Sequence, residues 1–404
     1  MQTNLAEFIR DTPEGREADA ILRKCVHCGF CTATCPTYQV LGDDLDSPRG
    51  RIYLIKRALE GAEVTDRTRL HLDRCLTCRA CETTCPSGVR YGRLVDIGRA
   101  VVEERTRRSP WDALKRALLA FALPRTRLFA VLLGLGRLFR GVLPEELKRR
   151  IPPSRGPGAW PQARHARKML ALAGCVQPSI APNINAAAAR VLDSAGISLI
   201  EAPGAGCCGA VRFHLNKQDA GRDDMRALID AWWPMVERGE VEAIVMTASG
   251  CGATVREYGE LLAHDPIYRD KAARISSLVR DLAEVVPAQA LESARGRAKV
   301  AFQAPCTLQH GQKIRGAAET LLAKAGFELT AVRDGHLCCG SAGTYSILQP
   351  ALSAELRARK LACLEEGAPQ AIATANIGCL AHLQGGTATP VRHWIELLDE
   401  ALAP

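Results

Sequence analysis

The sequence predicts a multidomain protein of α+β and α/β class, in which a small, mostly helical N-terminal domain precedes a duplicated α/β domain. Two observations lead to this prediction. The first 108 residues hold eight of the 17 cysteines in two identical spacings, and residues 167–404 hold the other nine in two similar halves. In those halves, short apolar runs of strand type alternate with helical patterns, which is typical of parallel β/α units.

The chain length and the distribution of residue types along it indicate how many domains to expect and where they end. A chain of 404 residues has room for two or three domains. We expect boundaries at 1–108, at 109–166 for a basic helical connector, and at 167–290 and 291–404 for the two repeats. The first twenty residues contain acidic side chains and no apolar run of the signal-peptide kind, so we expect a cytoplasmic protein. Clustered thiols in a reducing compartment are metal ligands more often than disulfides.

The N-terminal region carries the spacing C-x2-C-x2-C-x3-C-P twice, beginning at Cys25 and at Cys75. This is the spacing of bacterial ferredoxins with two [4Fe–4S] clusters, in which the fourth cysteine of each run binds the other cluster. Structural zinc also uses four cysteines, but it requires neither the third short step nor the proline. We therefore expect a ferredoxin-like domain with two [4Fe–4S] clusters. The expected ligands are Cys25, Cys28, Cys31 and Cys85 for cluster 1, and Cys75, Cys78, Cys81 and Cys35 for cluster 2.

The C-terminal region is an internal duplication with a period of about 130 residues. In each half a cysteine is followed 32 residues later by Cys-Cys-Gly, and a Gly-Cys pair closes the half. Expected strands precede the cysteines, at Met169–Ala173, Val241–Thr247, Val300–Ala304 and Ala371–Ala375. Because open parallel sheets bind ligands at the carboxyl ends of their strands, we expect the thiols of each half to converge there. The candidate sets are Cys175, Cys207, Cys208 and Cys251, and Cys306, Cys338, Cys339 and Cys379.

Four soft thiolates suit either an Fe–S cluster or zinc. The pattern leaves open which of the two is bound, and whether one repeat, both or neither binds it. The two C-x31-C-C-G arrangements resemble the cysteine-rich (CCG) domain of heterodisulfide reductases and related flavin-linked oxidoreductases. In that family the motif ends in C-x-x-C. Here the ends read Ala248-Ser-Gly-Cys251 and Asn376-Ile-Gly-Cys379. The missing thiol argues against an expanded noncubane cluster of the disulfide-reductase kind.

The connector carries most of the positive charge of the chain, whose formal net charge is +9. Residues 103–155 alone carry +8, and apolar stretches within them contain Arg125, Arg127, Arg137 and Arg140. The longest uncharged runs are too short to span a bilayer. The segment is expected to pack against the core or a partner subunit, or to lie on an anionic membrane surface. With 5% aromatic residues and no nucleic-acid motif, no nucleic-acid partner is expected.

A wider resemblance covers nearly the whole chain. The stretches CVHCGFCTATCPTYQ, DSPRGRIYLIK, HLCCGSAGTY and VRHWIEL, together with both cysteine modules, resemble the family of iron–sulfur subunits of bacterial glycolate oxidases (glycolate dehydrogenases). The resemblance implies that partner subunits carry FAD or FMN and oxidise glycolate to glyoxylate. This chain would then pass the electrons toward a quinone-type acceptor, on the cytoplasmic face of the inner membrane, and would supply no catalytic residue itself.

Two further expectations and two alternatives accompany this interpretation. No nucleotide-binding loop of the dinucleotide or P-loop type is expected, which agrees with a flavin on a partner. Arg49 and Arg51 are expected to offset cluster charge. The alternatives are the Fe–S subunit of a lactate or anaerobic glycerol-3-phosphate dehydrogenase, and a CCG-type disulfide reductase.

Overall fold

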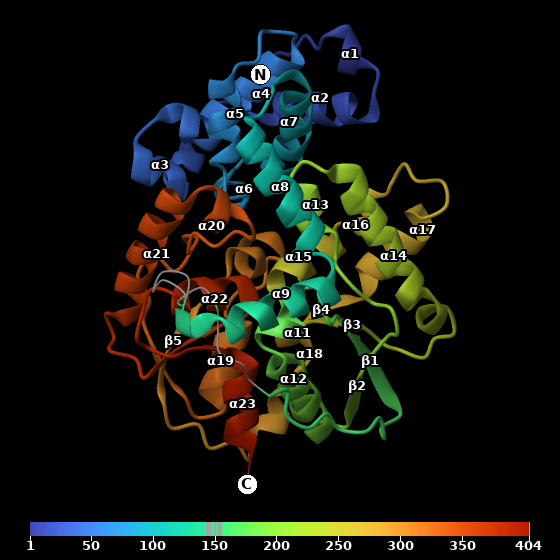
Figure 1. Cartoon of the computed structure of the whole chain (residues 1–404), viewed down its shortest axis with the longest axis vertical. Coiled ribbons are helices and arrows are strands. Elements are labelled where there is room, and N and C mark those ends of the chain that lie inside the picture. Colours follow the sequence, from blue (N-terminus) through green and yellow to red (C-terminus); the bar gives the residue numbers. More distant parts are fainter. Residues whose placement is uncertain (143–147, 149–150, 152–155, 404) are drawn as a thin grey trace. The chain divides into compact units, whose positions relative to one another are not determined.

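The computed structural model describes residues 1–142, 148, 151 and 156–403, and it divides into two compact units (Figure 1). The N-terminal unit consists of Met1–Ala117 and His336–Lys360. The C-terminal unit consists of Leu118–Gly335 and Leu361–Pro404. A short segment of the second repeat, which contains Cys338 and Cys339, therefore folds with the N-terminal unit.

The described residues of the N-terminal unit form helices and loops. Its elements are α1 (Glu7–Arg10), α2 (Pro13–Lys24), η1 (Phe30–Thr32), α3 (Pro36–Leu41), η2 (Asp44–Asp46), α4 (Pro48–Leu59), α5 (Asp66–Asp73), α6 (Ala80–Thr84), α7 (Tyr91–Arg105), the start of α8 (Pro110–Ala122), α20 (Tyr345–Leu348) and most of α21 (Pro350–Glu365). Two of these helices begin alike. The side chains of Thr12 and Ser47 accept a hydrogen bond from the third backbone N–H of α2 and α4, and proline follows each cap.

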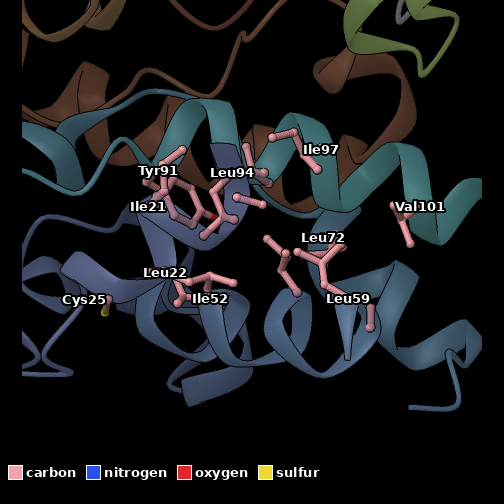
Figure 2. Close-up of a cluster of buried hydrophobic side chains, with 14 of the residues drawn as sticks. Ile21, Leu22, Cys25, Ile52, Leu59, Leu72, Tyr91, Leu94, Ile97 and Val101 are labelled. Atoms are coloured by element: carbon pink, nitrogen blue, oxygen red, sulfur yellow. The ribbon is translucent and has the colours of Figure 1, made fainter. Parts of the chain in front are cut away.

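The core of this unit lies between α2, α4, α5 and α7. Figure 2 shows Leu22, Ile52, Leu59, Leu72 and Leu94 pointing toward one another from these helices. Cys25, Cys75 and Cys81 belong to the same buried cluster. The helices that form the core therefore also fix the backbone on which these three thiols stand.

The C-terminal unit contains two four-stranded parallel sheets with the same topology. The first has the order β2-β1-β3-β4 and the second the order β6-β5-β7-β8. The strands are β1 (Arg167–Ala171), β2 (Ile197–Glu201), β3 (Ile244–Met246), β4 (Val279–Asp281), β5 (Lys299–Gln303), β6 (Glu328–Thr330), β7 (Ala371–Thr374) and β8 (Val391–His393). The predicted duplication and the α/β class of the repeats are confirmed.

Helices of the C-terminal unit connect these strands. In the first repeat they are α11 (Gln177–Ile180), α12 (Asn183–Ser194), α13 (Ala210–His214), α14 (Gln218–Glu237), α15 (Ser249–Arg256), α16 (Tyr258–Leu261), α17 (Arg269–Leu278) and α18 (Leu282–Val285). In the second they are η4 (Ala288–Leu291), the π-turn η5 (Thr307–Gly311), α19 (Ala317–Lys324), α22 (Ile377–Gln384) and α23 (Trp394–Leu402). The unit also contains α9 (Thr126–Leu138) and η3 (Arg140–Val142).

The two repeats join through hydrogen bonds between equivalent elements. The backbone N–H of Ser249 donates to Ala375 O at 3.1 Å, and the N–H of Gly250 donates to Asn376 Oδ1 at 3.2 Å. Away from this contact, α12 and α23 lie side by side, with Arg190 Nη2 of α12 2.6 Å from Asp399 Oδ2 of α23 (Figure 1). Because these bonds hold the ends of β3 and β7 together, the strand ends that precede Cys251 and Cys379 are fixed relative to each other.

Helices α8 and α9 expose apolar side chains. Those on α8 are Trp111, Leu114, Leu118 and Phe121, and those on or next to α9 are Val131, Leu132, Leu135, Leu138 and Phe139. Within each helix they recur at intervals of three and four residues, so they form one face. Among the described residues, no single helix is long and apolar enough to cross a membrane, whereas α8 and α9 together meet that criterion but are bent by 109°.

The junction between the repeats contains a buried histidine. His393 Nε2 lies 2.9 Å from Thr247 O, and His393 Nδ1 accepts a hydrogen bond from the N–H of Ile395. The neutral ring with its proton on Nε2 satisfies both contacts. Burial lowers the pKa of His393 to about 4, although the bond to Thr247 favours the charged ring.

This lowered pKa predicts acid destabilisation of the junction. The unfolded chain takes up a proton below pH about 6.5, while the folded chain resists it until about 4. Stability is therefore fully present above pH 6.5 and falls by about 1.4 kcal/mol per pH unit within that window. In thermal unfolding measured from pH 7.5 to 5.5, the wild type should lose stability more steeply than His393→Gln. Equal slopes would contradict the neutral, buried histidine.

Candidate metal centres

One group of thiols in the N-terminal unit surrounds a pocket. Cys25, Cys28, Cys31 and Cys85 all line it, and so do Cys81 and the residues Val26, His27, Pro48, Ile52 and Tyr91. Cys25 lies at the end of α2 and Cys85 at the end of α6, so two helix ends that are 60 residues apart in the sequence deliver these thiols to one place. Cys28 is exposed, whereas Cys25 is buried. The structure brings together the four residues expected for cluster 1.

A second group consists of Cys35, Cys75, Cys78 and Cys81. The pKa of Cys81 lies well above its usual value, first because the thiol is buried and further because Cys78, Cys75, Glu82 and Cys35 lie close to it. Cys35 caps the start of α3, directly before Pro36. The four residues expected for cluster 2 are thus neighbours as well.

The two cysteine loops repeat the same backbone conformation. His27 and Thr77 occupy equivalent positions and have φ values of 55° and 51°; Gly29 and Arg79 are equivalent and have φ values of 85° and 61°. A threonine with positive φ is strained, and such strain gathers where a binding site dictates the backbone. The shared conformation turns the three closely spaced thiols of each loop toward one centre.

Hydrogen-bond donors and positive charge surround the second group. Cys75 Sγ accepts from the Tyr91 hydroxyl at 3.5 Å and from the Thr77 N–H at 3.4 Å, and Arg51 Nη1 lies 3.9 Å from Cys35 Sγ. Burial raises the pKa of the Cys75 thiol, but the charges of Arg51 and Arg99 and these hydrogen bonds outweigh burial and leave the pKa below its usual value. Such surroundings stabilise thiolates, the form that binds metals.

The donor set in the N-terminal unit fits two Fe–S clusters. Each group offers four thiols, and soft thiolates are the ligands that Fe–S clusters use. The His27 imidazole also lines the pocket of the first group, in addition to its four thiols. Arg51 is buried beside the second group, as expected for an offset of cluster charge. The residues that sequence reasoning missed are Arg99 and Tyr91, because they come from α7, which carries no cysteine.

A third group of thiols lies in the C-terminal unit, at the carboxyl ends of three strands of the first sheet. Cys175 follows β1, Cys207 and Cys208 follow β2, and Cys251 stands in the first turn of α15 after β3. Hydrogen bonds link Cys175 to Cys207, Cys207 to Cys208, and Cys208 to Cys251. The sequence expectation that distant thiols of one half converge is met for this repeat.

The bend between Cys207 and Cys208 depends on a glycine. Gly209 has φ +82°, and a Cβ at that position would lie 2.5 Å from Gly221 O, so another residue would not fit without backbone movement. The Cys207 thiol has a lowered pKa, first because it accepts hydrogen bonds from Cys175 and Cys208, and further through the Gly209 N–H and Arg212. Burial and the nearby Cys207 charge raise the pKa of Asp224 to about 6.

Residues 204–209, Gly-Ala-Gly-Cys-Cys-Gly, also match the dinucleotide spacing G-x-G-x-x-G, contrary to the expectation from the sequence. The structure gives this segment a different role. The helix that follows, α13, has only five residues, and two of the six positions are thiols of the third group. A dinucleotide loop instead opens the long helix of a βαβ unit, with its N-terminus free to meet a pyrophosphate.

The cysteines of the second repeat belong to different units. Cys306 and Cys379 lie in the C-terminal unit, at the start of η5 and within α22, and Asn376 Nδ2 is 3.5 Å from Cys379 Sγ. Cys338 and Cys339 lie in the N-terminal unit, where the Gly340 N–H is 3.5 Å from Cys338 Sγ. Gly340 has φ +88° and packs against Ser353 O, as Gly209 packs against Gly221 O. The local turn after the paired cysteines is therefore the same in both repeats.

Comparison with known proteins agrees with this arrangement. Residues 21–89 match the family described as 4Fe-4S dicluster domain, and residues 169–256 and 300–384 match the family described as Cysteine-rich domain. The glycolate oxidase iron-sulfur subunit of Escherichia coli (strain K12) is 54% identical, over 100% of this chain and 99% of the relative. The chain belongs to the family of glycolate oxidase iron–sulfur subunits. It is an Fe–S protein of an oxidoreductase complex, with an electron-transfer role.

More distant relatives follow the same plan in part. The probable glycolate oxidase iron-sulfur subunit of Bacillus subtilis (strain 168) is 30% identical, over 90% of this chain and 89% of its own length. The lactate utilization protein A of Bacillus velezensis is 26% identical, but that match covers 52% of this chain and 88% of the relative. Similarity throughout the chain is thus found with the glycolate oxidase subunits.

The predicted exchange of the fourth thiol between the two clusters can be tested with Cys35→Ser. Because Cys35 lies with Cys75, Cys78 and Cys81, its replacement should alter the EPR signal of the reduced cluster at those residues. The spectrum should therefore resemble that of Cys78→Ser and differ from that of Cys28→Ser. Cys363→Ser, outside all the sets, is the control. A Cys35→Ser spectrum that matches Cys28→Ser would show that the fourth thiol is not exchanged.

Proposed function

We propose that this chain is the electron-transfer subunit of a glycolate dehydrogenase complex, with two [4Fe–4S] clusters in its N-terminal unit. In this proposal a flavin on a partner subunit oxidises glycolate to glyoxylate, and the chain passes the two electrons, one at a time, toward a quinone-type acceptor. The observation that carries the proposal is the pair of four-thiol groups in a chain that is 54% identical throughout to the E. coli subunit.

The chain's own residues hold and insulate the clusters. We infer that Cys25, Cys28, Cys31 and Cys85 bind one and that Cys75, Cys78, Cys81 and Cys35 bind the other. When bound, a [4Fe–4S] cluster would take up and return single electrons. The core of α2, α4, α5 and α7 keeps water from the buried thiols, and Tyr91, Thr77 and Arg51 stabilise their negative charge.

The third group of thiols is proposed to hold a further Fe–S cluster or zinc. Cys175, Cys207, Cys208 and Cys251 are mutually hydrogen bonded and closed off from water except at Cys251, which is half-buried. This repeat ends in the single cysteine Cys251 where the related domains have C-x-x-C, so it offers four thiol ligands. Iron and zinc analysis of the purified complex, with and without Cys208→Ser, distinguishes the two metals.

The proposed function predicts which substrate reduces the clusters. In the anaerobically purified complex, glycolate should produce the EPR signal of reduced [4Fe–4S] clusters. The two clusters of the N-terminal unit should contribute about eight iron atoms for each copy of this chain. L-Lactate and glycerol 3-phosphate, the substrates of the alternative complexes, serve as controls. Reduction by either of them and not by glycolate would reject the glycolate assignment.

We also propose that the complex is peripheral on the cytoplasmic face of the inner membrane and that α9 takes part in the contact. The face of α9 exposes Val131, Leu135 and Leu138, the last 76% exposed. Arg125 directly precedes the helix, and Arg127 stands in its first turn. Apolar side chains next to arginines favour the interface of a membrane with anionic lipids. The positive charge of residues 103–155 supports the same partner.

This contact predicts lipid-dependent binding. The complex should sediment with vesicles that contain phosphatidylglycerol, and salt should weaken the binding because it screens the arginines. The double variant Leu135→Glu/Leu138→Glu should lose most of it. Ile267→Glu, which changes an equally exposed apolar residue elsewhere, should not. If the double variant instead keeps vesicle binding and loses a partner subunit, the α9 face is a subunit interface.

A further inference from the structure

A buried guanidinium stands beside the second thiol group of the N-terminal unit. The side chain of Arg51 is 1% exposed, and each of its nitrogens has a partner. Nε donates to His71 O at 2.7 Å, Nη1 to Thr37 Oγ1 at 3.1 Å, and Nη2 to Asp46 Oδ1 at 3.2 Å. Nη1 also lies 3.9 Å from Cys35 Sγ. The charge is therefore fixed in position, away from water, against a thiol of this group.

The charges around this group do not cancel. Asp46 is fully buried and is shared with a second arginine, because Arg74 Nη1 donates to Asp46 Oδ2 at 2.8 Å. Arg99, also buried, donates to the backbone carbonyls of Leu72 and Cys75. Glu82 adds a negative charge near Cys81. The three arginines Arg51, Arg74 and Arg99 thus stand with two carboxylates, those of Asp46 and Glu82, so positive charge is in excess among these residues.

The first thiol group has different surroundings. The one charged residue among those lining its pocket is Arg49, whose side chain is 38% exposed and pairs with Asp44 at 2.9 Å. Cys28 is exposed. Water screens an exposed arginine far more than a buried one.

We propose that Arg51 gives the cluster site of Cys35, Cys75, Cys78 and Cys81 a higher reduction potential than the site of Cys25, Cys28, Cys31 and Cys85. The inference rests on the proposed binding of two clusters. Adding an electron adds negative charge, which a nearby buried cation stabilises; net charge, hydrogen bonds to sulfur and solvent exposure are the factors that set such potentials.

The consequence is a direction for electrons within the unit. One electron leaves the exposed site, which is oxidised, and reduces the buried site; no bond forms or breaks, and no proton moves. The reductant is the flavin of the proposed partner. The exposed site is then the place of exchange with another protein, and the buried site is where the electron resides at equilibrium.

The experiment is a redox titration of the purified complex followed by EPR, with Cys28→Ser and Cys78→Ser assigning the two signals. In the wild type the buried site should have the higher potential. Arg51→Met should shift the equilibrium between the sites toward the exposed one by at least tenfold, which is 59 mV for one electron. Asp46→Asn, which removes the balancing negative charge, should shift it the opposite way, and Arg51→Lys should retain most of the wild-type difference.

Arg93→Met is the control, because Arg93 forms an ion pair with Glu17 in the same unit that is less buried than the pair of Arg51 with Asp46. It should move neither potential. Shifts of the same sign in Arg51→Met and Asp46→Asn, or no shift in either, would overturn the inference, as would a lower potential at the buried site of the wild type. If Arg51→Met does not fold, the shifts measured in Asp46→Asn and Arg51→Lys still test the inference. Absence of cluster signals in the wild type would instead reject the proposed function.

Discussion

Four sulfur atoms must meet at one point before a cluster can be held, and this requirement governs the N-terminal unit. Each cysteine loop supplies three thiols from seven residues of sequence, through the left-handed residues at His27 and Thr77. The fourth thiol comes from the other loop, so Cys35 and Cys85 tie two distant segments together. The packing of α4 against α7 holds the two loops at the required distance, and the hydrophobic core is therefore a condition of the metal sites.

The C-terminal unit solves the same problem with a different scaffold. A parallel sheet places the ends of its strands along one edge, and the order β2-β1-β3-β4 sends consecutive connections to opposite sides of β1. The loops after β1, β2 and β3 then meet, which brings Cys175, Cys207, Cys208 and Cys251 together. The glycine after each cysteine pair permits a turn that a regular strand, with its alternating side chains, could not provide.

What could be read from the sequence follows from these two mechanisms. The cysteine spacings and the period of the repeat are local or self-similar patterns. They predicted the fold class, the strands β1, β3, β5 and β7, and the thiols that meet within the N-terminal unit and the first repeat. Arg99 and Tyr91 act on Cys75 from α7 and leave no mark in the spacing of the cysteines. The folding of His336–Lys360 with the N-terminal unit has no local signal either, since Tyr345 reaches the carbonyl of Arg74 across 271 residues. Residues 204–209 show the opposite case. Their spacing matches that of a dinucleotide-binding loop, but in the structure they carry two thiols of the third group.

The burial of Arg51 is difficult to explain by stability alone. Removing an arginine and an aspartate from water costs several kcal/mol per ion, and a hydrophobic pair of the same volume often serves the fold as well or better. Arg51 also engages Thr37 and the His71 carbonyl, which leaves it no freedom to reach water. A fixed positive charge in a dry site is costly for the fold but useful for a neighbouring group that gains and loses an electron. The same burial that destabilises the ion pair strengthens its effect on that group, because the field is not screened. The position of Arg51 is thus better explained by electron transfer than by folding.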